Sequence, residues 1–286
     1  MPVVLLFIIF VIGLVIAIPV SITLGITSVL PSVFDPSFTV GAKYLIRAMF
    51  GGLDSFPLLA VPMFVLSGII MAKGGISRKL FDIFAYFLGN LTAGMPCAVI
   101  VTCLFYGAIS GSAPATVAAV GSMTIPILTS LGYDLTFSTA IVAVAGGLGV
   151  IIPPSIPFIM YGMASGASVS DLFLAGIIPG LMIGGLLMFY AIFYCKRNGE
   201  DKAKIHAEVK RLHDKGLFKV VKESFFAILS PVIILGCIYS GIASPTEAAV
   251  ISVFYALFIS LFVYKSICIK DIWSILQEAV KTFSRI

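Results

Sequence analysis

The sequence predicts an all-α integral membrane protein. Of its 286 residues, 60% are hydrophobic and only 11% are charged, and the mean hydropathy is +1.15, well above that of soluble globular domains. Apolar segments near the length of about 20 residues that a helix needs to cross a bilayer recur along the whole chain. Backbone that is exposed to lipid must satisfy its own hydrogen bonds, so these segments are expected to be helices.

Six apolar segments are expected to span the membrane. They cover residues 3–30, 56–72, 136–165, 174–194, 224–242 and 246–264. The first segment has no basic region before it and is longer than the core of a signal peptide, so we expect it to be retained. It can also hold two shorter helices that break near Pro19. A further apolar block, residues 94–130, has small polar residues at its centre.

Basic residues predict how the chain is oriented in the membrane. Residues 196–223 form the only long polar segment and contain nine Lys or Arg against five Asp or Glu. Such segments stay in the cytoplasm, so we expect a solvated cytoplasmic helix here rather than a lipid-binding or nucleic-acid-binding segment. Following the spans outward from this segment places Lys73 and Lys265 on the same face, provided that residues 94–130 enter and leave on one side.

The block of residues 94–130 predicts a re-entrant helical hairpin. Its central part, residues 105–126, reads FYGAISGSAPATVAAVGSMTIP. About 13 residues lie on either side of the SGSAPA centre, or roughly 20 Å of helix, which is less than the ~30 Å hydrocarbon core. The expected tip consists of Ser110, Gly111, Ser112 and Pro114. Non-helical backbone at membrane depth is tolerated only where it is buried in protein or lines a cavity, so we expect this tip to face a binding site.

A second break is predicted in residues 146–162, which read GGLGVIIPPSIPFIMYG. Pro153, Pro154 and Pro157 have no amide hydrogen and crowd the preceding turn. The span should therefore consist of two half-helices joined by an unwound segment from Gly149 to Ser155. In secondary transporters, discontinuous helices direct free carbonyls and helix ends at ions and substrates. A proline kink without a ligand is the alternative, but the neighbouring hairpin favours a site.

The chemical groups in this region predict an alkali cation. Between Asp82 and Asp171 the only charged residue is Asp134, which stands in a short connection and is expected to cap a helix. Proton carriers usually have carboxylates or histidines inside the membrane, and this region has none. What remains is carbonyl oxygens and the hydroxyls of Ser110, Ser112, Thr116 and Ser155. Hard oxygen ligands suit Na⁺, although each hydroxyl can instead bond only to the preceding helical turn.

Two carboxylates that look functional are expected to be structural. Ser244, Pro245 and Glu247 have the spacing of a capping box at the start of a helix, and Ser168 and Asp171 repeat this spacing. The five cysteines show no CxxC spacing, so no metal site is expected from them. An intramembrane enzyme is also not expected, because no Ser/His pair, HExxH or GxGD-like arrangement is present.

Several motifs together resemble the large membrane subunit of the tripartite ATP-independent periplasmic (TRAP) transporters. They are, in order, LAVPMFVLSGIIMAKGGISRKL, FYGAISGSAPATVAAVGSMTIPILTSLGY, GVIIPPSIPFIMYGMASGASVSDLFLAGIIPG and GIASPTEAAVISVFYAL. The resemblance implies an elevator-like fold of the ion transporter superfamily in the bacterial inner membrane. It also implies sodium-driven symport of organic acids such as C4-dicarboxylates or sialic acid. Two partners are implied, a small four-helix membrane subunit and a soluble periplasmic substrate-binding protein.

The same resemblance implies roles for the residues at the two breaks. It assigns a Na⁺ site to Ser110, Gly111, Ser112, Gly149, Val150, Pro153, Pro154 and Ser155. The substrate carboxylate is expected beside Ser112, Thr116 and Ser155, where helix N-termini favour negative charge. Na⁺ is the only cofactor implied.

The resemblance also implies a division of the chain. The expected parts are scaffold spans with an arm segment (1–93), a transport region (94–195), the cytoplasmic basic segment (196–223) and the start of an inverted second repeat (224–286). The arm segment is amphipathic, carries Lys43 and Arg47, and is expected at the outer interface. No SGS-type or PPS-type break follows residue 165, so we expect a chain truncated within its second repeat. A stand-alone sodium/carboxylate symporter and a truncated, non-transporting membrane scaffold are the alternatives.

Overall fold

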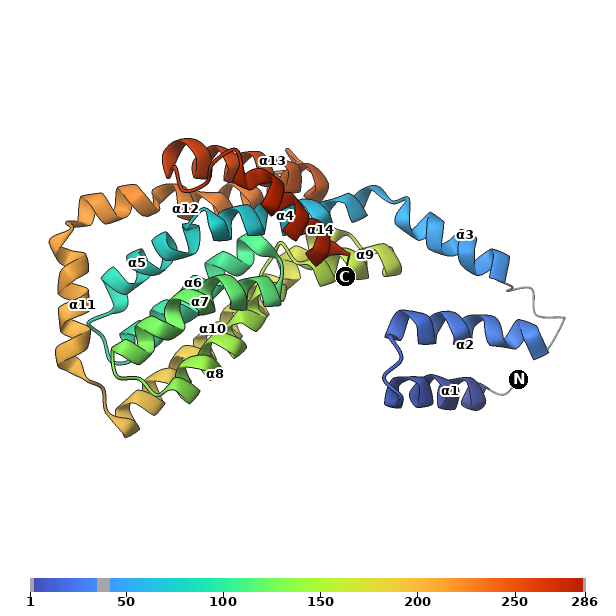
Figure 1. Cartoon of the computed structure of the whole chain (residues 1–286), viewed down its shortest axis with the longest axis horizontal. Helices are drawn as coiled ribbons and strands as arrows, with labels where there is room; N and C mark the ends of the chain where they lie inside the picture. Colours follow the sequence, from blue (N-terminus) through green and yellow to red (C-terminus); the bar gives the residue numbers. More distant parts are fainter. Residues whose placement is uncertain (1–2, 35–41, 285–286) are drawn as a thin grey trace. The chain divides into compact units, whose positions relative to one another are not determined.

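The computed structural model describes residues 3–34 and 42–284, and every regular element in these residues is a helix (Figure 1). The chain forms two compact units, Met1–Ser55 and Phe56–Ile286, which are described separately. Five helical segments are long and apolar enough to cross a membrane, as an all-α membrane protein requires. They are Phe56–Lys73, Ala113–Ser130, Val169–Asn198, Leu217–Tyr239 and Pro245–Val263.

The first unit contains α1 (Val3–Val15), α2 (Val20–Phe34) and α3 (Ala42–Leu53). A single span over residues 3–30 is therefore wrong, and the alternative of two shorter helices is confirmed. Pro19 is the physical reason, because it has no amide hydrogen to continue α1 and lies directly before α2. The amphipathic arm segment forms helix α3, which carries Lys43 and Arg47, whereas its position at the outer interface stays a prediction.

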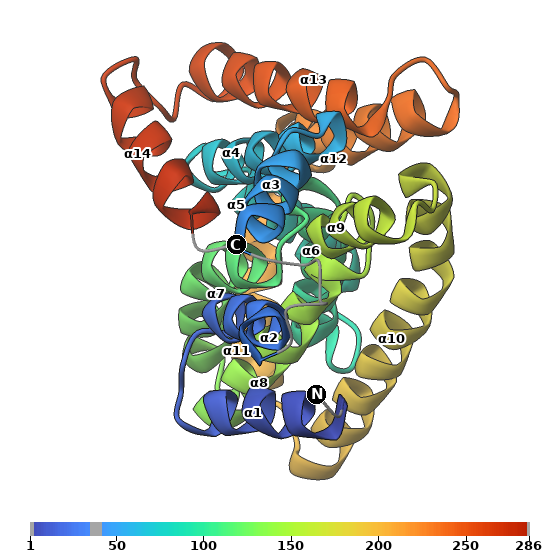
Figure 2. The ribbon, with the colours of Figure 1, turned by 90° about the vertical axis from the view of Figure 1, so that its right-hand side faces the viewer.

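Helix α6 (Gly94–Ser110) is the centre of the second unit. Fifteen of its 17 residues are buried, which explains why this helix is apolar on all faces. The helices that contact it include α4 (Ala60–Lys73), α5 (Ile76–Leu88), α7 (Ala113–Ser130), α8 (Leu135–Gly146), α10 (Val169–Asn198) and α12 (Leu217–Tyr239). Figure 2 shows α10 along one side of this unit and α14 (Asp271–Phe283) on the opposite side.

Helices α6 and α7 form the expected hairpin, but its limbs are longer than predicted. They contain 17 and 18 residues instead of about 13. Pro96 lies in the first turn of α6, where a missing amide hydrogen breaks no helical hydrogen bond, and Pro126 is accommodated inside α7. By length and composition α7 alone can cross a membrane. The argument from short limbs is therefore wrong, and the re-entrant placement of the hairpin stays a prediction.

The span expected at residues 136–165 is broken as predicted. Helix α8 continues into the short 3₁₀ helix η2 (Gly147–Val150), an irregular stretch covers residues 151–155, and α9 (Ile156–Ser165) follows. Helix α10 packs closely on this stretch. A Cβ atom on Gly176 would lie 2.5 Å from the Ile151 carbonyl oxygen, so only glycine allows this approach.

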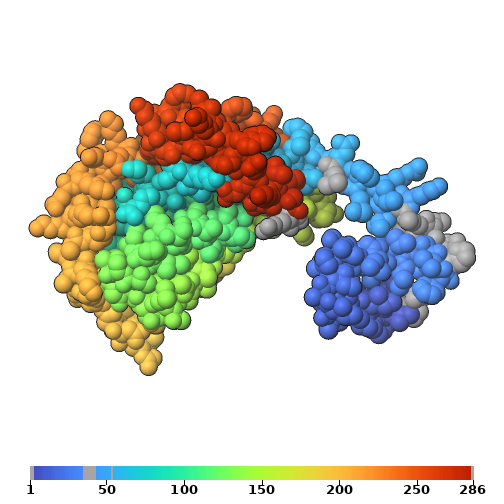
Figure 3. Space-filling view, in the orientation of Figure 1, coloured from blue at the N-terminus to red at the C-terminus, as the bar shows by residue number. Residues whose placement is uncertain are grey.

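The remaining helices of the second unit surround this region. The 3₁₀ turn η1 (Phe56–Leu59) leads into α4, and α11 (Lys202–Asp214) is the helix expected in the basic segment. Helix α13 (Pro245–Phe258) continues into a π-helical turn, Ile259–Val263. Helix α4 packs against both α13 and α14, and α14 forms part of the molecular surface over α4 (Figure 3).

The predicted helix caps are confirmed. At the start of α8, Asp134 accepts a hydrogen bond from the Phe137 amide at 3.0 Å. Ser244 and Glu247 form a capping box at the start of α13, in which the Ser244 amide donates to Glu247 Oε2 at 2.7 Å. Ser168 caps α10 with its hydroxyl alone, which accepts from the amide of Asp171 at 3.4 Å, and the structure gives no reciprocal bond from the Ser168 amide to the Asp171 carboxylate, so the second half of the expected capping box is not formed. These carboxylate and hydroxyl groups therefore stabilise helix ends.

Candidate functional site

The hairpin tip and the helix break lie side by side. Gly111 has a φ of 61°, a left-handed conformation that glycine adopts without strain, and it reverses the chain between α6 and α7. Its carbonyl accepts a hydrogen bond from the Ile156 amide at 3.2 Å, at the start of α9. A Cβ atom on Gly111 would lie only 2.8 Å from the Pro154 carbonyl oxygen. The structure therefore joins the two non-helical segments that the sequence predicts.

Two further glycines allow this close contact. A Cβ atom on Gly107 would lie 2.6 Å from Cα of Gly149, and one on Gly149 would lie 2.4 Å from Thr116 Oγ1 and 3.0 Å from the Ser112 carbonyl oxygen. The first of these neighbours is backbone, which cannot move aside without shifting a helix. Gly149 is thus the point at which η2 packs against the first turn of α7.

A small network of oxygen atoms connects the hairpin tip with α7. Ser110 Oγ lies 3.0 Å from Thr116 Oγ1, and Thr116 Oγ1 donates to the Ser112 carbonyl oxygen at 2.9 Å. The side chains of Ser110 and Thr116 are fully buried, so both hydroxyls need such partners. The network brings hydroxyl and carbonyl oxygens together in a place that is shielded from the surroundings.

Ser155 forms hydrogen bonds within the helix break. Its hydroxyl donates to the Val150 carbonyl oxygen at 2.6 Å and accepts from the Phe158 amide at 3.4 Å, which caps α9. Ser155 is also fully buried. Its hydroxyl, like those of Ser110 and Thr116, therefore has partners within the chain, which is the purely structural role that the sequence leaves open for each of them.

The structure brings most of the predicted site residues together. From the hairpin come Ser110, Gly111, Ser112 and Thr116, and from the break come Gly149, Val150, Pro154 and Ser155. Pro153 instead lines an apolar groove with Leu104 and Pro231. The nearby donor atoms are hydroxyl and carbonyl oxygens, without a carboxylate, imidazole or thiolate among these residues. Such a donor set fits an alkali cation, which prefers hard oxygen ligands.

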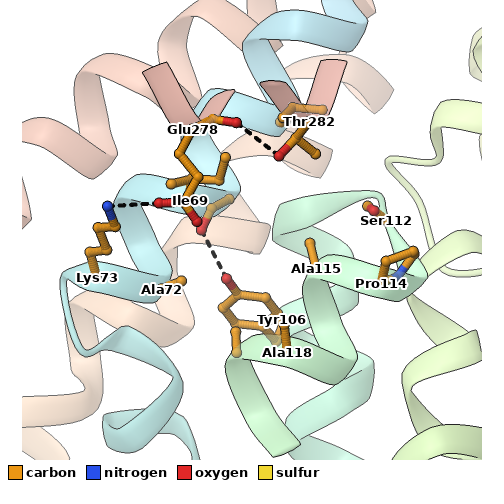
Figure 4. Close-up of a pocket in the computed structure, with 13 residues that line it drawn as sticks. Ile69, Ala72, Lys73, Tyr106, Ser112, Pro114, Ala115, Ala118, Glu278 and Thr282 are labelled. Carbon is orange, nitrogen blue, oxygen red and sulfur yellow. Dashed lines mark hydrogen bonds and ion pairs between the residues drawn. The ribbon is translucent and has the colours of Figure 1, made fainter. Parts of the chain in front are cut away.

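A cavity of about 470 Å³ lies beside the hairpin tip (Figure 4). Its wall is formed by α4, by the first turns of α7 with Ser112, Pro114 and Ala115, and by α14. Within the described part of the chain, Ser112 Oγ forms no hydrogen bond, unlike the hydroxyls of Ser110 and Ser155. Ser112 is therefore the predicted site residue whose side chain is free to contact a ligand in this cavity.

The sequence does not predict two polar contacts in the cavity wall. The buried Tyr106 donates to the Gly68 carbonyl oxygen at 2.8 Å and fixes α6 on α4. Lys73 Nζ lies 2.7 Å from Glu278 Oε2 and connects the end of α4 with α14 (Figure 4). Lys73 directly follows a predicted span (56–72) and Glu278 stands much later in the chain, so no local pattern pairs them. Only the packing of α14 on α4 brings these two charges together.

A carboxylate holds both ends of the hairpin at its base. Both oxygens of Glu200 accept from the Ala93 amide at 3.1 Å, and the Tyr133 hydroxyl donates to Glu200 Oε1 at 2.5 Å. Ala93 directly precedes α6, and Tyr133 lies between α7 and α8. Burial, and then the hydrogen bond to Glu200, raise the pKa of Tyr133 well above its ordinary value, so its hydroxyl remains a donor.

Comparison with known proteins gives one consistent result. A model of the family described as "Tripartite ATP-independent periplasmic transporter, DctM component" matches residues 7–286. The isethionate TRAP transporter permease protein DctMQ of Oleidesulfovibrio alaskensis is 42% identical over 273 residues, which cover 96% of this chain and 42% of the relative. The C4-dicarboxylate TRAP transporter large permease protein DctM of Rhodobacter capsulatus is 33% identical over 279 residues, which cover 91% of this chain and 61% of the relative.

The name of a third relative refers to another compound. The sialic acid TRAP transporter large permease protein SiaM of Vibrio cholerae is 36% identical over 244 residues, which cover 85% of this chain and 56% of the relative. The chain spans about half the length of the curated relatives it matches.

Proposed function

Because the chain belongs to the DctM component family of the tripartite ATP-independent periplasmic transporters, we propose that it is a permease subunit of a sodium-coupled, binding-protein-dependent transporter that imports organic acids. The family consists of transport proteins of the bacterial inner membrane, not of enzymes. The helices of the second unit agree with this location, because five segments are long and apolar enough to span a bilayer.

The proposal that Na⁺ is the coupling ion rests on the oxygen atoms at the hairpin tip. Hydroxyl and carbonyl groups of Ser110, Ser112 and Thr116 meet the break at Gly149, and no group that titrates near neutral pH is among them. A proton-coupled carrier would need such a group, whereas Na⁺ needs only oxygen ligands. The proposed Na⁺ ligands are the residues of the tip and the break. Pro153 would act there by shaping the backbone.

The proposed substrate class follows from the cavity and from the relatives. Isethionate, C4-dicarboxylate and sialic acid, the compounds in the names of the relatives, are all organic anions. Ser112 is the N-cap of α7 and lines the cavity, so an anion there meets the positive end of an 18-residue helix. Ser112, Thr116 and Ser155 remain the residues proposed beside the substrate carboxylate.

The proposed partners are a small four-helix membrane subunit and a soluble periplasmic substrate-binding protein. The relatives support these partners, because they are large permease proteins of TRAP transporters. Helix α3 supports a contact surface, because the apolar side chains of Tyr44, Met49 and Phe50 are exposed on a helix that also carries Lys43 and Arg47. A lipid bilayer is the other surface that such a helix fits.

The test is sodium-dependent uptake by the permease as its native cell makes it, together with its partner proteins. We expect Ser112→Ala to raise the Na⁺ concentration for half-maximal uptake about three- to tenfold, the effect of one lost oxygen contact. Ser122→Ala is the matched control, because Ser122 is an exposed serine on the same helix, away from the tip. Equal Na⁺ dependence in the Ser112 variant and the parent contradicts a side-chain role for Ser112.

The same uptake assay separates the alternatives. If uptake by the parent protein does not depend on Na⁺, the proposal that Na⁺ is the coupling ion is contradicted. Uptake that continues without the periplasmic protein favours a stand-alone sodium/carboxylate symporter. Co-purification with membrane partners but no uptake under any ion gradient favours a non-transporting scaffold.

A further inference from the structure

We propose that Lys73 is a carboxylate-binding residue of the cavity beside the hairpin tip, and that Glu278 competes with the carboxylate of the transported anion for Lys73. This inference rests on the proposed function, because it takes the transported molecule to be an organic acid. It adds a charged contact to a site that otherwise consists of hydroxyl and carbonyl groups.

The position of Lys73 in the cavity is the first argument. Among the described residues that line the cavity, Lys73 is the only one with a positive charge. Ser112, the half-buried hydroxyl of the tip that has no hydrogen-bond partner among the described residues, lines the same cavity from the start of α7 (Figure 4). The rest of the lining is mostly apolar, including Val65, Ile69 and Ala118. An organic acid that contacts Ser112 therefore finds its positive partner at Lys73.

The contact made by Glu278 is the second argument. Its carboxylate oxygen lies 2.7 Å from Lys73 Nζ, which is the geometry of a charge-assisted hydrogen bond and is what a carboxylate ligand would form. The two side chains are 37% and 52% exposed, so the pair is only weakly stabilised and can exchange partners. A flexible lysine chain suits this exchange better than the rigid fork of an arginine.

The packing of α14 is the third argument. Glu278 belongs to α14, and the only residues of this helix that are buried are Ile275 and Ala279. A helix with so little buried surface can move away from α4 when its ion pair is replaced. Binding of an anion at Lys73 is therefore expected to change the surroundings of α14 at the cavity wall.

The experiment uses the single tryptophan of the chain as its signal. Trp273 lies on α14 and is 69% exposed, so its fluorescence reports on the surroundings of this helix. The purified full chain in lipid nanodiscs is titrated with acetate and with succinate at constant ionic strength. Succinamide, which has the size of succinate but no charge, is the ligand control. We expect a saturable fluorescence change with the acids and none with succinamide.

Three variants then separate carboxylate binding from a structural role of the ion pair. Lys73→Met removes the proposed binding charge and should raise the midpoint of the titration about tenfold, whereas Lys73→Arg should largely restore it. Glu278→Gln removes the competitor and should lower the midpoint about threefold. If the pair only fastens α14, both Lys73→Met and Glu278→Gln break the same link and shift the midpoint in the same direction. That result overturns the inference.

The control variant is Glu223→Gln. Glu223 forms an ion pair with Lys79 at 2.5 Å, which also joins two helices but does not line the cavity. Its removal should leave the midpoint unchanged, and an equal shift in this variant also overturns the inference. No fluorescence change with either acid, while sodium-dependent uptake is retained, rejects the role of Lys73 and leaves the proposed function intact. If the parent protein with its partner proteins takes up no organic acid, the proposed function itself is rejected.

Discussion

At Gly149 the absence of a side chain decides whether the hairpin tip and the helix break can touch. A methyl group there would lie 2.4 Å from Thr116 Oγ1 and 3.0 Å from the Ser112 carbonyl oxygen. We expect Gly149→Ala to lower the free energy of unfolding by about 1–3 kcal/mol, because a packed interior resists added volume. The same change should weaken Na⁺ dependence of uptake, because it separates the oxygen atoms of the tip.

Gly147→Ala is the control for this prediction. Gly147 lies in the same 3₁₀ turn, and a Cβ atom on it would have no neighbour within 4 Å. Thermal unfolding of the two purified variants in one detergent gives the comparison. A melting temperature of Gly149→Ala equal to that of Gly147→Ala would show that the break tolerates the extra methyl group.

Single residues are predicted well where the signal is local. The caps formed by Asp134, Ser168 and Glu247 follow from spacing within one helical turn, and the glycine and serines of the tip follow from their position in an apolar block. The pairing of Lys73 with Glu278 is different. It depends on how α14 packs against α4, which no local spacing encodes.

The α6–α7 hairpin is held at its base by the loops on either side, and this predicts the effect of pH. Tyr133 donates to Glu200, and burial together with Glu200 raises the pKa of Tyr133. A raised pKa in the folded state means that the stabilisation is present below the ordinary tyrosine pKa of about 10 and is lost as pH rises further. Tyr133→Phe should therefore cost about 1 kcal/mol, constant from about pH 6 to about pH 9.

Unfolding of the parent and of Tyr133→Phe across this pH range measures the difference. Tyr161→Phe is the control, because Tyr161 is 59% exposed on α9. A difference that already disappears below about pH 9 contradicts a tyrosine that stays protonated. If Tyr133→Phe lowers the free energy of unfolding no more than Tyr161→Phe does, the hydrogen bond from Tyr133 to Glu200 does not stabilise the base of the hairpin.

The sequence predicts that a helix is present more reliably than it predicts the residues at which the helix begins and ends. The break after η2 and the reversal at Gly111 are where the sequence predicts them, because proline and glycine act on the backbone directly. The hairpin limbs are longer than expected because Pro96 falls in a first helical turn, where it is tolerated. Residues 3–30 form two helices rather than one span because Pro19 outweighs the continuous hydrophobicity around it.

For the whole molecule, the distribution of charge predicts the orientation in the membrane. The basic segment of residues 196–223 should face the cytoplasm, and the connection between α9 and α10 should face the periplasm. In a background in which the exposed Cys268 is replaced by serine, Ala167→Cys should react with an impermeant maleimide in intact spheroplasts. His206 is exposed on α11, so a cysteine at this position can react with the reagent. Because α11 is expected on the cytoplasmic side, His206→Cys should react only after the membrane is opened. The opposite pattern contradicts the orientation.

The hydrogen bond from the Ile156 amide to the Gly111 carbonyl has a consequence for how such a protein can evolve. Both partners are main-chain groups, so most side-chain changes at position 156 leave the bond in place, and only proline there removes the donor. At position 111 the backbone path itself requires glycine, because a Cβ atom would lie 2.8 Å from the Pro154 carbonyl oxygen. The link between hairpin and break is thus inherited with the path of the backbone. The hydroxyls around it can be exchanged during divergence, and ion or cargo preference can drift, while the two segments stay joined.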